Sequence, residues 1–164
     1  MPISLFKLAG TLALLTVLAA APARAAAYYD TTYRATFKPD AETLEVELDL
    51  AGNKLPSKVT LRADPERYKN FRSTDPLVIG KDEVTWQPQG KKSRLRYEFV
   101  VNHQRSANRY DAYKTDTWAL FRGDKLVPSA RVTAAKNLES RATLEFVLPA
   151  GWSAATPYSP SGSG

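Results

Sequence analysis

Strict alternation of apolar and polar side chains is the feature that most constrains what this chain can fold into. The clearest case is the run LEVELDL at residues 44–50, in which leucine and valine alternate with acidic residues. Successive side chains of a β-strand point to opposite faces of the sheet, so this run indicates a strand with one buried face. Weaker versions of the pattern occur at residues 33–37, 59–61, 84–86, 95–101, 118–121 and 144–148. We therefore expect strands at these positions.

Turn-forming residues separate the predicted strands, for example at Pro39-Asp40. Many short strands divided by turns predict an all-β fold, here an antiparallel β-sandwich of about seven short strands. One helical signal interrupts the pattern at Asp64-Pro65-Glu66, where an N-cap residue precedes a proline and an acidic residue. It predicts a short helical turn that ends by Phe71, with Tyr68 and Phe71 on one side.

The polar faces of two predicted strands carry opposite charges. The strand at residues 44–50 exposes glutamate and aspartate, whereas Arg94 and Arg96 lie on the polar face of the strand that reaches Val101. If the two strands are neighbours, the opposite charges favour their register by roughly a few tenths of a kcal/mol per pair. The alternative is two faces that are solvated independently.

The N-terminus has the order of features found in a secretory signal peptide. A single basic residue, Lys7, precedes an apolar run over residues 8–21, and the small-residue motif Ala23-Arg24-Ala25 follows. A transmembrane anchor is the alternative, but the run is short for about 30 Å of hydrocarbon and Pro22 interrupts it. We expect cleavage after Ala25 or Ala27, which makes the product a periplasmic or secreted bacterial protein.

The predicted boundaries are a cleaved signal peptide at residues 1–25, one domain at residues 26–158 and a Ser/Gly/Pro tail at residues 159–164. The chain of 164 residues has a net charge of +6, and loss of Lys7 and Arg24 with the leader lowers it to +4. A domain of this size can bury most of the surface of its unfolded chain. The absence of Cys excludes disulfides, a thiolate metal site and a Cys nucleophile.

Recognisable catalytic motifs are missing from the sequence. The only His is His103, whereas a zinc peptidase motif needs two imidazoles one helical turn apart. Neither a Gly-x-Ser-x-Gly motif nor a phosphate-binding glycine loop is present. A Ser-Lys pair, or a carboxylate pair such as Glu66 with Asp82 or Glu83, stays open because it depends on distances in the fold. We expect no metal, no cofactor and no catalytic residue, with His103 in a solvated loop.

Residues 102–116 combine basic and aromatic side chains. Arg105 and Arg109 lie among Tyr110 and Tyr113, a set that could pair with and stack on an anionic or planar ligand. In a secreted protein, an anionic polysaccharide or a peptide carboxylate fits this set better than nucleic acid does. The alternative is a long solvated connection whose tyrosines cover the end of the sandwich.

The chain has three tryptophans, Trp86, Trp118 and Trp152. An indole ring buries a large apolar area and carries only one hydrogen-bond donor. We therefore expect these residues to anchor the core or a corner of the fold rather than to form a carbohydrate-binding platform.

Four short motifs follow one another in the second half of the chain. They are Arg109-Tyr-Asp-Ala-Tyr113, Trp118-Ala-Leu-Phe-Arg-Gly123, Leu126-Val-Pro128 and the run LEFVLPAGWSAAT at residues 144–156. This order resembles the N-terminal domain of the M61 metallopeptidases, the glycyl aminopeptidases, over residues 33–158. The resemblance implies a β-sandwich that precedes a thermolysin-like catalytic domain.

Two differences from the family's motifs limit which residue roles this resemblance implies. Where the family typically has Trp-x-Pro-Gly-x-Tyr, this chain has residues 62–68, and only Pro65 and Tyr68 match. The resemblance therefore makes Tyr68 a candidate ligand-binding residue on the substrate side. The catalytic domain with its His-Glu-x-x-His motif has no counterpart in the sequence, so no zinc ligand or general base has a matching position.

These observations predict a secreted, non-catalytic β-sandwich module that serves as a scaffold or substrate-flanking domain. Its expected partner is a peptidase catalytic domain or a peptide substrate, with no nucleic acid and no stable membrane insertion after leader cleavage. The alternative is a free-standing periplasmic module that binds an anionic ligand through Arg105, Arg109, Tyr110 and Tyr113. A hydrolase with an unrecognised carboxylate pair is a third hypothesis.

Overall fold

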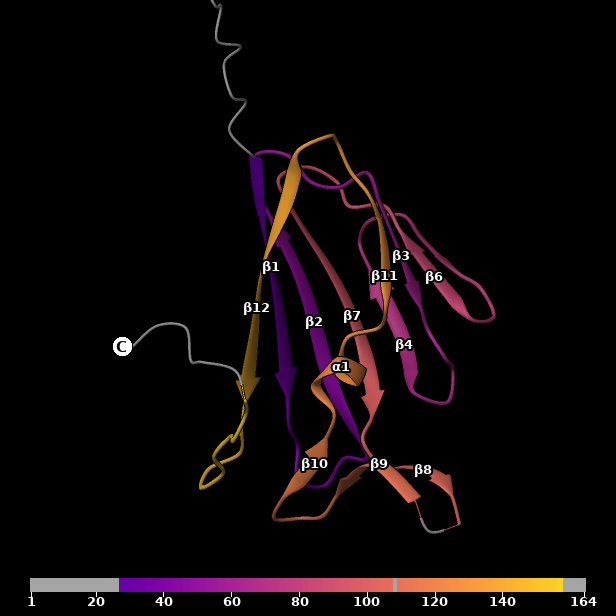
Figure 1. Ribbon diagram of the computed structural model, residues 1–164, viewed down its shortest axis with the longest axis vertical. Helices are drawn as coiled ribbons and strands as arrows, with labels where there is room; N and C mark the ends of the chain where they lie inside the picture. Colours follow the sequence, from indigo (N-terminus) through magenta and orange to yellow (C-terminus); the bar gives the residue numbers. More distant parts are fainter. Residues whose placement is uncertain (1–26, 108, 158–164) are drawn as a thin grey trace, which may run out of the picture.

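The computed structural model describes residues 27–107 and 109–157, without the side chain of Arg105. The predicted signal peptide at residues 1–25 and the predicted tail at residues 159–164 lie outside the described residues. The described residues form twelve strands in three sheets, with one short helix (Figure 1).

The largest sheet has five strands in the order β12-β1-β2-β7-β4. The strands are β1 (Ala27–Thr36), β2 (Thr43–Ala51), β4 (Tyr68–Ser73), β7 (Lys92–Val100) and β12 (Leu138–Val147). The pair of β1 and β12 is parallel, and the other neighbours are antiparallel. The turn after β2 brings Gly52 close to β1, because a Cβ atom at this position would lie 2.9 Å from Tyr29 Cβ.

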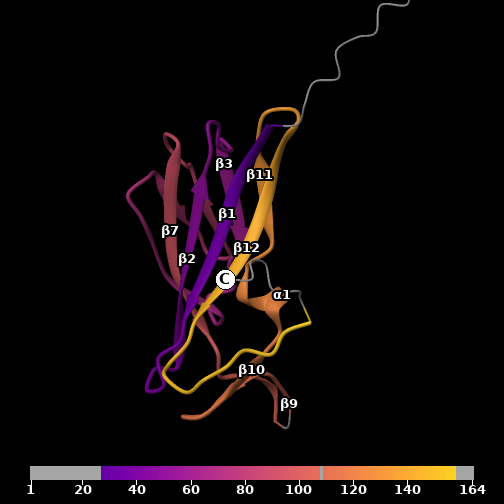
Figure 2. The ribbon, with the colours of Figure 1, turned by 90° about the vertical axis from the view of Figure 1, so that its left-hand side faces the viewer.

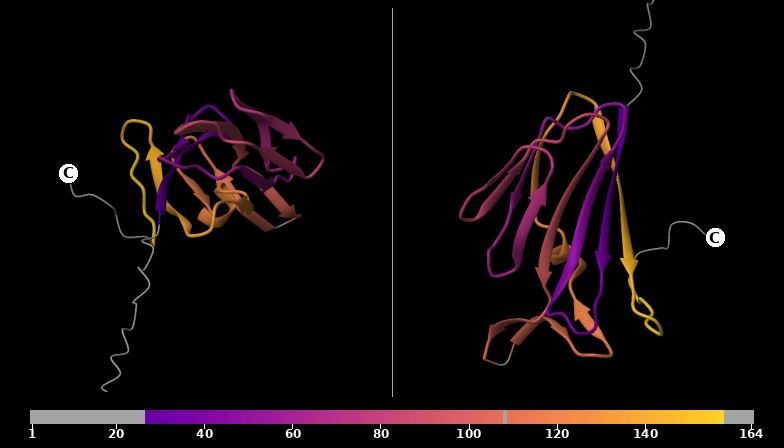
Figure 3. Two further views of the ribbon diagram at one scale, coloured as in Figure 1. Left: turned by 90° about the horizontal axis from the view of Figure 1, so that it is seen from above. Right: turned by 180° about the vertical axis from the view of Figure 1, so that it is seen from behind.

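A second sheet has four antiparallel strands in the order β11-β3-β6-β5. They are β3 (Lys58–Arg62), β5 (Leu77–Ile79), β6 (Glu83–Trp86) and β11 (Ala130–Thr133). Figures 2 and 3 show this sheet as a second layer beside the five-stranded one. The two layers form the sandwich.

The third sheet is small and lies at one end of the sandwich (Figure 1). It contains three antiparallel strands in the order β10-β9-β8, namely β8 (His103–Ser106), β9 (Arg109–Lys114) and β10 (Ala119–Phe121). The helix α1 (Gly123–Leu126) follows it. Tyr97 fixes α1 to the core, because its hydroxyl donates a 2.8 Å hydrogen bond to the Leu126 carbonyl.

The core lies between the sheets and combines inward-facing residues of both layers. Alternate residues of β2 and β7 are fully buried, and Trp86 of β6 and Leu61 of β3 meet them from the other layer. Each large apolar side chain that is buried in this way contributes roughly 1.5–3 kcal/mol to folding. The alternation that the sequence shows is therefore the direct cause of the sandwich.

The predicted all-β sandwich is confirmed, but three details differ. The described residues form twelve strands rather than about seven, because short strands of three or four residues escape the alternation pattern. The closing pair of β1 and β12 is parallel. The helical stretch expected between Asp64 and Phe71 is a single turn, in which the Asp64 carbonyl accepts from Tyr68 N–H at 2.8 Å before β4 begins.

The oppositely charged faces turn out to be neighbours in one sheet. β2 pairs with β7 so that Glu47 lies opposite Arg96 and Asp49 opposite Arg94. Glu47 accepts a 2.7 Å hydrogen bond from Arg96 Nε and also lies within 3.5 Å of a guanidinium nitrogen of Arg34. The two charged faces are therefore paired rather than solvated independently, and the opposite charges favour the observed register.

Within the described ranges, the structure contains no helix that is long and apolar enough to cross a membrane.

Candidate binding surface

The position of the small sheet depends on one buried cation. The turn that Asp64 begins places Arg67 beneath β9, where its guanidinium donates a 2.7 Å hydrogen bond to an Asp111 carboxylate oxygen. The same oxygen lies 2.8 Å from His103 Nδ1, and Arg67 also stacks over the Phe99 ring at 4.9 Å. These contacts hold β8 and β9 on the end of the sandwich.

The charge of Asp111 is stabilised by this arrangement. Burial is the largest single influence and disfavours the ionised carboxyl, but the hydrogen bond from His103 and the positive charge of Arg67 outweigh it. The pKa of Asp111 is therefore lowered from its ordinary value. The prediction that His103 lies in a solvated loop is wrong, because His103 begins β8 and is half-buried against Asp111.

Lys114 also has a structural role. Its side chain is buried and its ammonium group bonds to the Pro39 carbonyl, while its backbone N–H donates to Asn102 Oδ1 at 2.7 Å. Although Lys114 belongs to the basic segment of the sequence, its charge faces inward. On β10, Phe121 packs against the core, and its ring centroid lies 5.9 Å from that of Phe37.

The outer face of the small sheet carries a cluster of exposed aromatic rings. We call Tyr110, Tyr113, Trp118 and Leu120 the aromatic patch; their exposed fractions are 53%, 40%, 48% and 70%. The ring centroids of Tyr110 and Tyr113 lie 5.1 Å apart, and those of Tyr113 and Trp118 lie 5.5 Å apart. Leu120 is the cross-strand partner of Tyr113, so the four side chains form one continuous surface.

The structure brings together most of the predicted ligand-binding residues. Arg105 lies in β8, although its side chain is not described, and the exposed Arg109 begins β9 next to Tyr110. The segment is not an irregular connection, since residues 103–106 and 109–114 are paired strands, and ligand binding by these residues stays a prediction. The exception is Tyr68, which is buried in the core and donates a 2.6 Å hydrogen bond to the Lys125 carbonyl. Burial raises the pKa of the Tyr68 hydroxyl.

Of the three tryptophans, two are anchors as expected. Trp86 is fully buried, and Trp152 is half-buried with its ring centroid 6.2 Å from that of Phe37. The expectation for Trp118 is wrong, because it lies at the end of a tight turn where Thr115 N–H donates to its carbonyl at 2.8 Å. That turn directs the indole ring away from the core.

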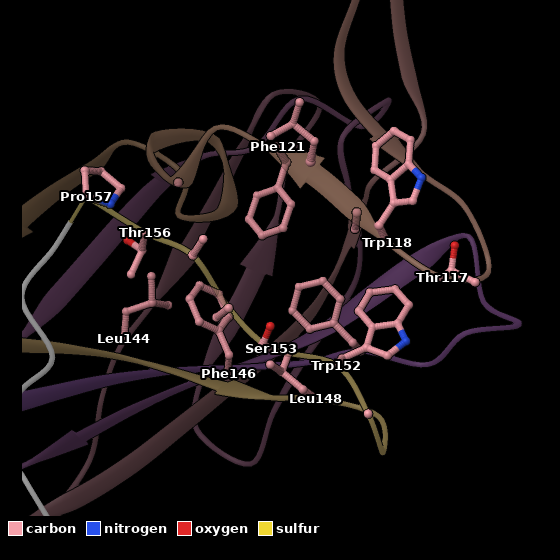
Figure 4. Close-up of a pocket in the computed structure, with 17 residues that line it drawn as sticks. Thr117, Trp118, Phe121, Leu144, Phe146, Leu148, Trp152, Ser153, Thr156 and Pro157 are labelled. Atoms are coloured by element: carbon pink, nitrogen blue, oxygen red, sulfur yellow. The ribbon is translucent and has the colours of Figure 1, made fainter.

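A cavity of about 450 Å³ lies beside β10 and borders the aromatic patch, because Trp118 and Leu120 are among the residues that line it. It is enclosed by β10, by the end of β12 and by the C-terminal segment at residues 151–157 (Figure 4). Sequence reasoning missed this cavity, because its walls come from segments far apart in the chain. Within the described residues, no group of three His, Cys, Asp or Glu side chains could hold a metal ion.

Comparisons with known proteins give structural likeness alone. No protein-family model and no curated protein sequence matches the chain. Among solved structures, an aminopeptidase N family protein from Idiomarina loihiensis is similar with a TM-score of 0.50 and 11% identity, over 71% of this chain and 22% of that one. The described domain thus has a fold that also occurs in an aminopeptidase N family protein.

Two further solved structures have weaker likeness. A two-domain M1 zinc metallopeptidase bound to L-arginine has a TM-score of 0.26 and 15% identity, over 51% of this chain and 22% of that one. A GH20 exo-β-N-acetylglucosaminidase from Vibrio harveyi has a TM-score of 0.32 and 16% identity, over 79% of this chain and 19% of that one. The chain spans about a fifth of the length of each of these three proteins.

Proposed function

We propose that this chain is a non-catalytic β-sandwich module that flanks a peptidase catalytic domain and contacts it through the aromatic patch. The fold shared with an aminopeptidase N family protein supports the peptidase association. The resemblance of the motifs to the N-terminal domain of the M61 metallopeptidases supports the more specific family. The partner domain is either a continuation of this chain or a separate polypeptide.

The exposure of the aromatic patch is the observation that carries this proposal. Three aromatic rings and Leu120 form a continuous apolar surface on strands that are held rigidly from behind by Arg67. Contiguous exposed apolar surface of this kind is typical of protein-binding sites, in which aromatic residues supply much of the binding energy. The assignment as non-catalytic depends on the sequence, which supplies one His where a zinc peptidase motif needs two.

The compartment belongs to the same proposal. The leader pattern at residues 1–25 supports export to the periplasm or the medium. Absence of Cys leaves the domain dependent on its packed core in that compartment.

A second candidate function uses the same sheet. Arg109 is exposed and adjoins Tyr110, so it places a positive charge beside the aromatic patch, and the backbone of Arg105 lies in the neighbouring strand β8. This arrangement supports a free-standing module that binds an anionic polysaccharide or a peptide carboxylate. In that case Arg109→Ala would weaken binding of a polyanion such as heparin far more than Arg62→Ala, which changes an exposed arginine on β3.

Site-specific photo-crosslinking in the producing cells tests the leading proposal. A benzoylphenylalanine at position 118 should give an adduct with a polypeptide that contains His-Glu-x-x-His, identified by mass spectrometry. The same group at position 78 is the control, because Val78 is 65% exposed but lies on β5 of the other layer. Identical products from both positions would show that the patch has no specific partner, and chelator-sensitive peptidase activity of the isolated chain would contradict the non-catalytic assignment.

A further inference from the structure

The strand β12 has one unpaired edge. It pairs with β1 along its whole length, and this ladder continues at both ends, where Phe37 N–H donates to the Val147 carbonyl and Ala27 N–H to the Asn137 carbonyl. In a strand, the N–H and C=O groups of successive residues point to opposite sides. Odd-numbered residues of β12 therefore face β1, and Ser140, Ala142, Leu144 and Phe146 direct their backbone groups to the free side, where no described strand pairs with them.

The apolar cavity begins at the same residues. The side chains of Leu144 and Phe146 line it, together with Phe121 of β10 and with Leu148 and Trp152 beyond β12 (Figure 4). None of the residues that line it carries a charge. A strand that paired with the free edge would place the side chain opposite Leu144 or Phe146 on the same face, beside this cavity.

We propose that the free edge of β12 and the adjoining cavity bind an extended polypeptide segment that carries a bulky uncharged side chain. The backbone of the segment pairs with Ala142, Leu144 and Phe146, and its apolar side chain enters the cavity. This mode of recognition obtains affinity from main-chain hydrogen bonds and selectivity from a side-chain pocket. The cavity borders the aromatic patch, because Trp118 and Leu120 also line it, whereas the free edge of β12 belongs to a different sheet from Tyr110 and Tyr113.

The opposite edge of the same sheet, β4, and the edge strand β5 are less suited to this role. β5 has only three residues, and β4 carries a register shift between Lys69 and Arg72. Short edge strands, bulges and edge lysines are the features by which proteins prevent further strand pairing. β12 is ten residues long and contains no proline, and its charged Glu145 is turned to Arg34 of β1 at 2.9 Å rather than across the edge.

The charge and volume of the cavity determine which peptide side chain can enter it. The cavity is lined by aromatic and aliphatic side chains and by the hydroxyl residues Thr117, Ser153 and Thr156, without a charged group, so an ionised side chain would lose hydration without gaining an ionic partner. Its volume of about 450 Å³ lies in the range of ordinary ligand sites and admits a leucine or phenylalanine side chain with its neighbouring backbone. The expected ligand class is therefore a peptide strand with leucine or an aromatic residue at its centre.

Fluorescence anisotropy with two labelled peptides tests the proposal on the full chain. Both peptides alternate threonine and valine, and they differ only in a central leucine or aspartate. We expect the leucine peptide to bind the wild-type protein at least about tenfold more tightly than the aspartate peptide. Failure of the leucine peptide to bind, or equal binding of both peptides, would overturn the proposal.

The variant Ala142→Pro tests the contribution of strand pairing without changing the residues that line the cavity. Proline removes an N–H that faces the free side and leaves the bonds to β1 intact, and proline is tolerated on edge strands in this orientation. We expect about tenfold weaker binding of the leucine peptide, whereas Ala142→Ser, which keeps the N–H, should bind as the wild type does. Equal binding by Ala142→Pro and wild type, with both folded by circular dichroism, would contradict strand pairing.

Amide hydrogen exchange keeps the proposal testable if Ala142→Pro does not fold. Addition of the leucine peptide to the wild-type protein should slow exchange at Ala142, Leu144 and Phe146 and leave Tyr113 of the aromatic patch unchanged. Slowed exchange at Tyr110 and Tyr113 with no change at β12 would place the peptide on the tyrosine side of the patch and overturn the assignment to β12. If the chain forms a dimer without peptide and Ala142→Pro abolishes that dimer, a second copy of the chain binds the edge of β12. That result would also overturn the proposal.

Discussion

At the residue scale, Arg67 is the side chain that connects the sandwich to the small sheet. It is only 5% exposed, and one guanidinium nitrogen bonds to Asp111 while the ring of Phe99 covers its face. Arg67→Leu would leave the Asp111 carboxylate without its cation and should lower the free energy of unfolding by about 2–4 kcal/mol. Urea denaturation measures this change, and Arg62→Leu, at an exposed arginine, should stay within about 0.5 kcal/mol of wild type. Similar losses for both variants would contradict a specific role for Arg67.

The carboxyl of Asp111 should make stability depend on pH in acid. Its pKa is lowered in the folded protein, since His103 and Arg67 outweigh the opposing effect of burial. A carboxyl with a lowered folded-state pKa stabilises the protein above its unfolded pKa of about 3.9, and this contribution is lost as the pH falls through the folded-state pKa. In Asp111→Asn the free energy of unfolding should therefore fall less steeply below about pH 4 than in wild type. Equal slopes in denaturation measured from pH 2 to pH 6 would show that the Asp111 pKa is the same in both states.

At the element scale, the pairing of β2 with β7 is supported by the charges around Glu47. Its carboxylate lies within hydrogen-bond or ion-pair distance of Arg34, Arg94 and Arg96, and its side chain is only 16% exposed. Glu47→Gln should lower the free energy of unfolding by about 1 kcal/mol at low ionic strength and by less in 1 M salt, which screens partly exposed pairs. Glu139→Gln on β12 is the control, because Glu139 is exposed and outside this group. A loss in Glu47→Gln that does not change with salt would point to packing rather than charge.

The same elements show how much of the fold could be predicted from sequence. β2 and β7 have long runs of alternation, so their existence, their buried faces and the complementarity of their charges could be predicted. β5 has three mostly exposed residues and pairs with the next strand, β6, whereas β11 has four exposed residues and pairs with the distant strand β3. Nothing local in the sequence specifies such a partner, nor the parallel closure of β1 by β12.

At the scale of the whole molecule, side chains of one type are sorted into opposite roles by the arrangement of the sheets. Trp86 and Trp118 were both expected to be anchors. The four-stranded layer buries Trp86 completely, whereas the turn before β10 leaves Trp118 48% exposed. Sequence reasoning grouped Arg109, Tyr110 and Tyr113 correctly but missed the contribution of Trp118, because the direction of a turn residue is set by tertiary structure.

We therefore predict that Trp86 contributes mainly to stability, whereas Trp118 contributes mainly to partner binding. Trp118→Ser removes an exposed ring of the aromatic patch, so it should change the free energy of unfolding by less than about 0.5 kcal/mol. Trp86→Ser opens a cavity in the core and leaves a hydroxyl there, and it should cost about 3–5 kcal/mol. If the patch contacts a peptidase domain, the photo-crosslink from a benzoylphenylalanine at position 113 should be lost in Trp118→Ser, although that variant folds normally by circular dichroism. A crosslink that persists in this variant would mean that Trp118 is exposed without taking part in the contact, and the partner surface would then be confined to β8 and β9.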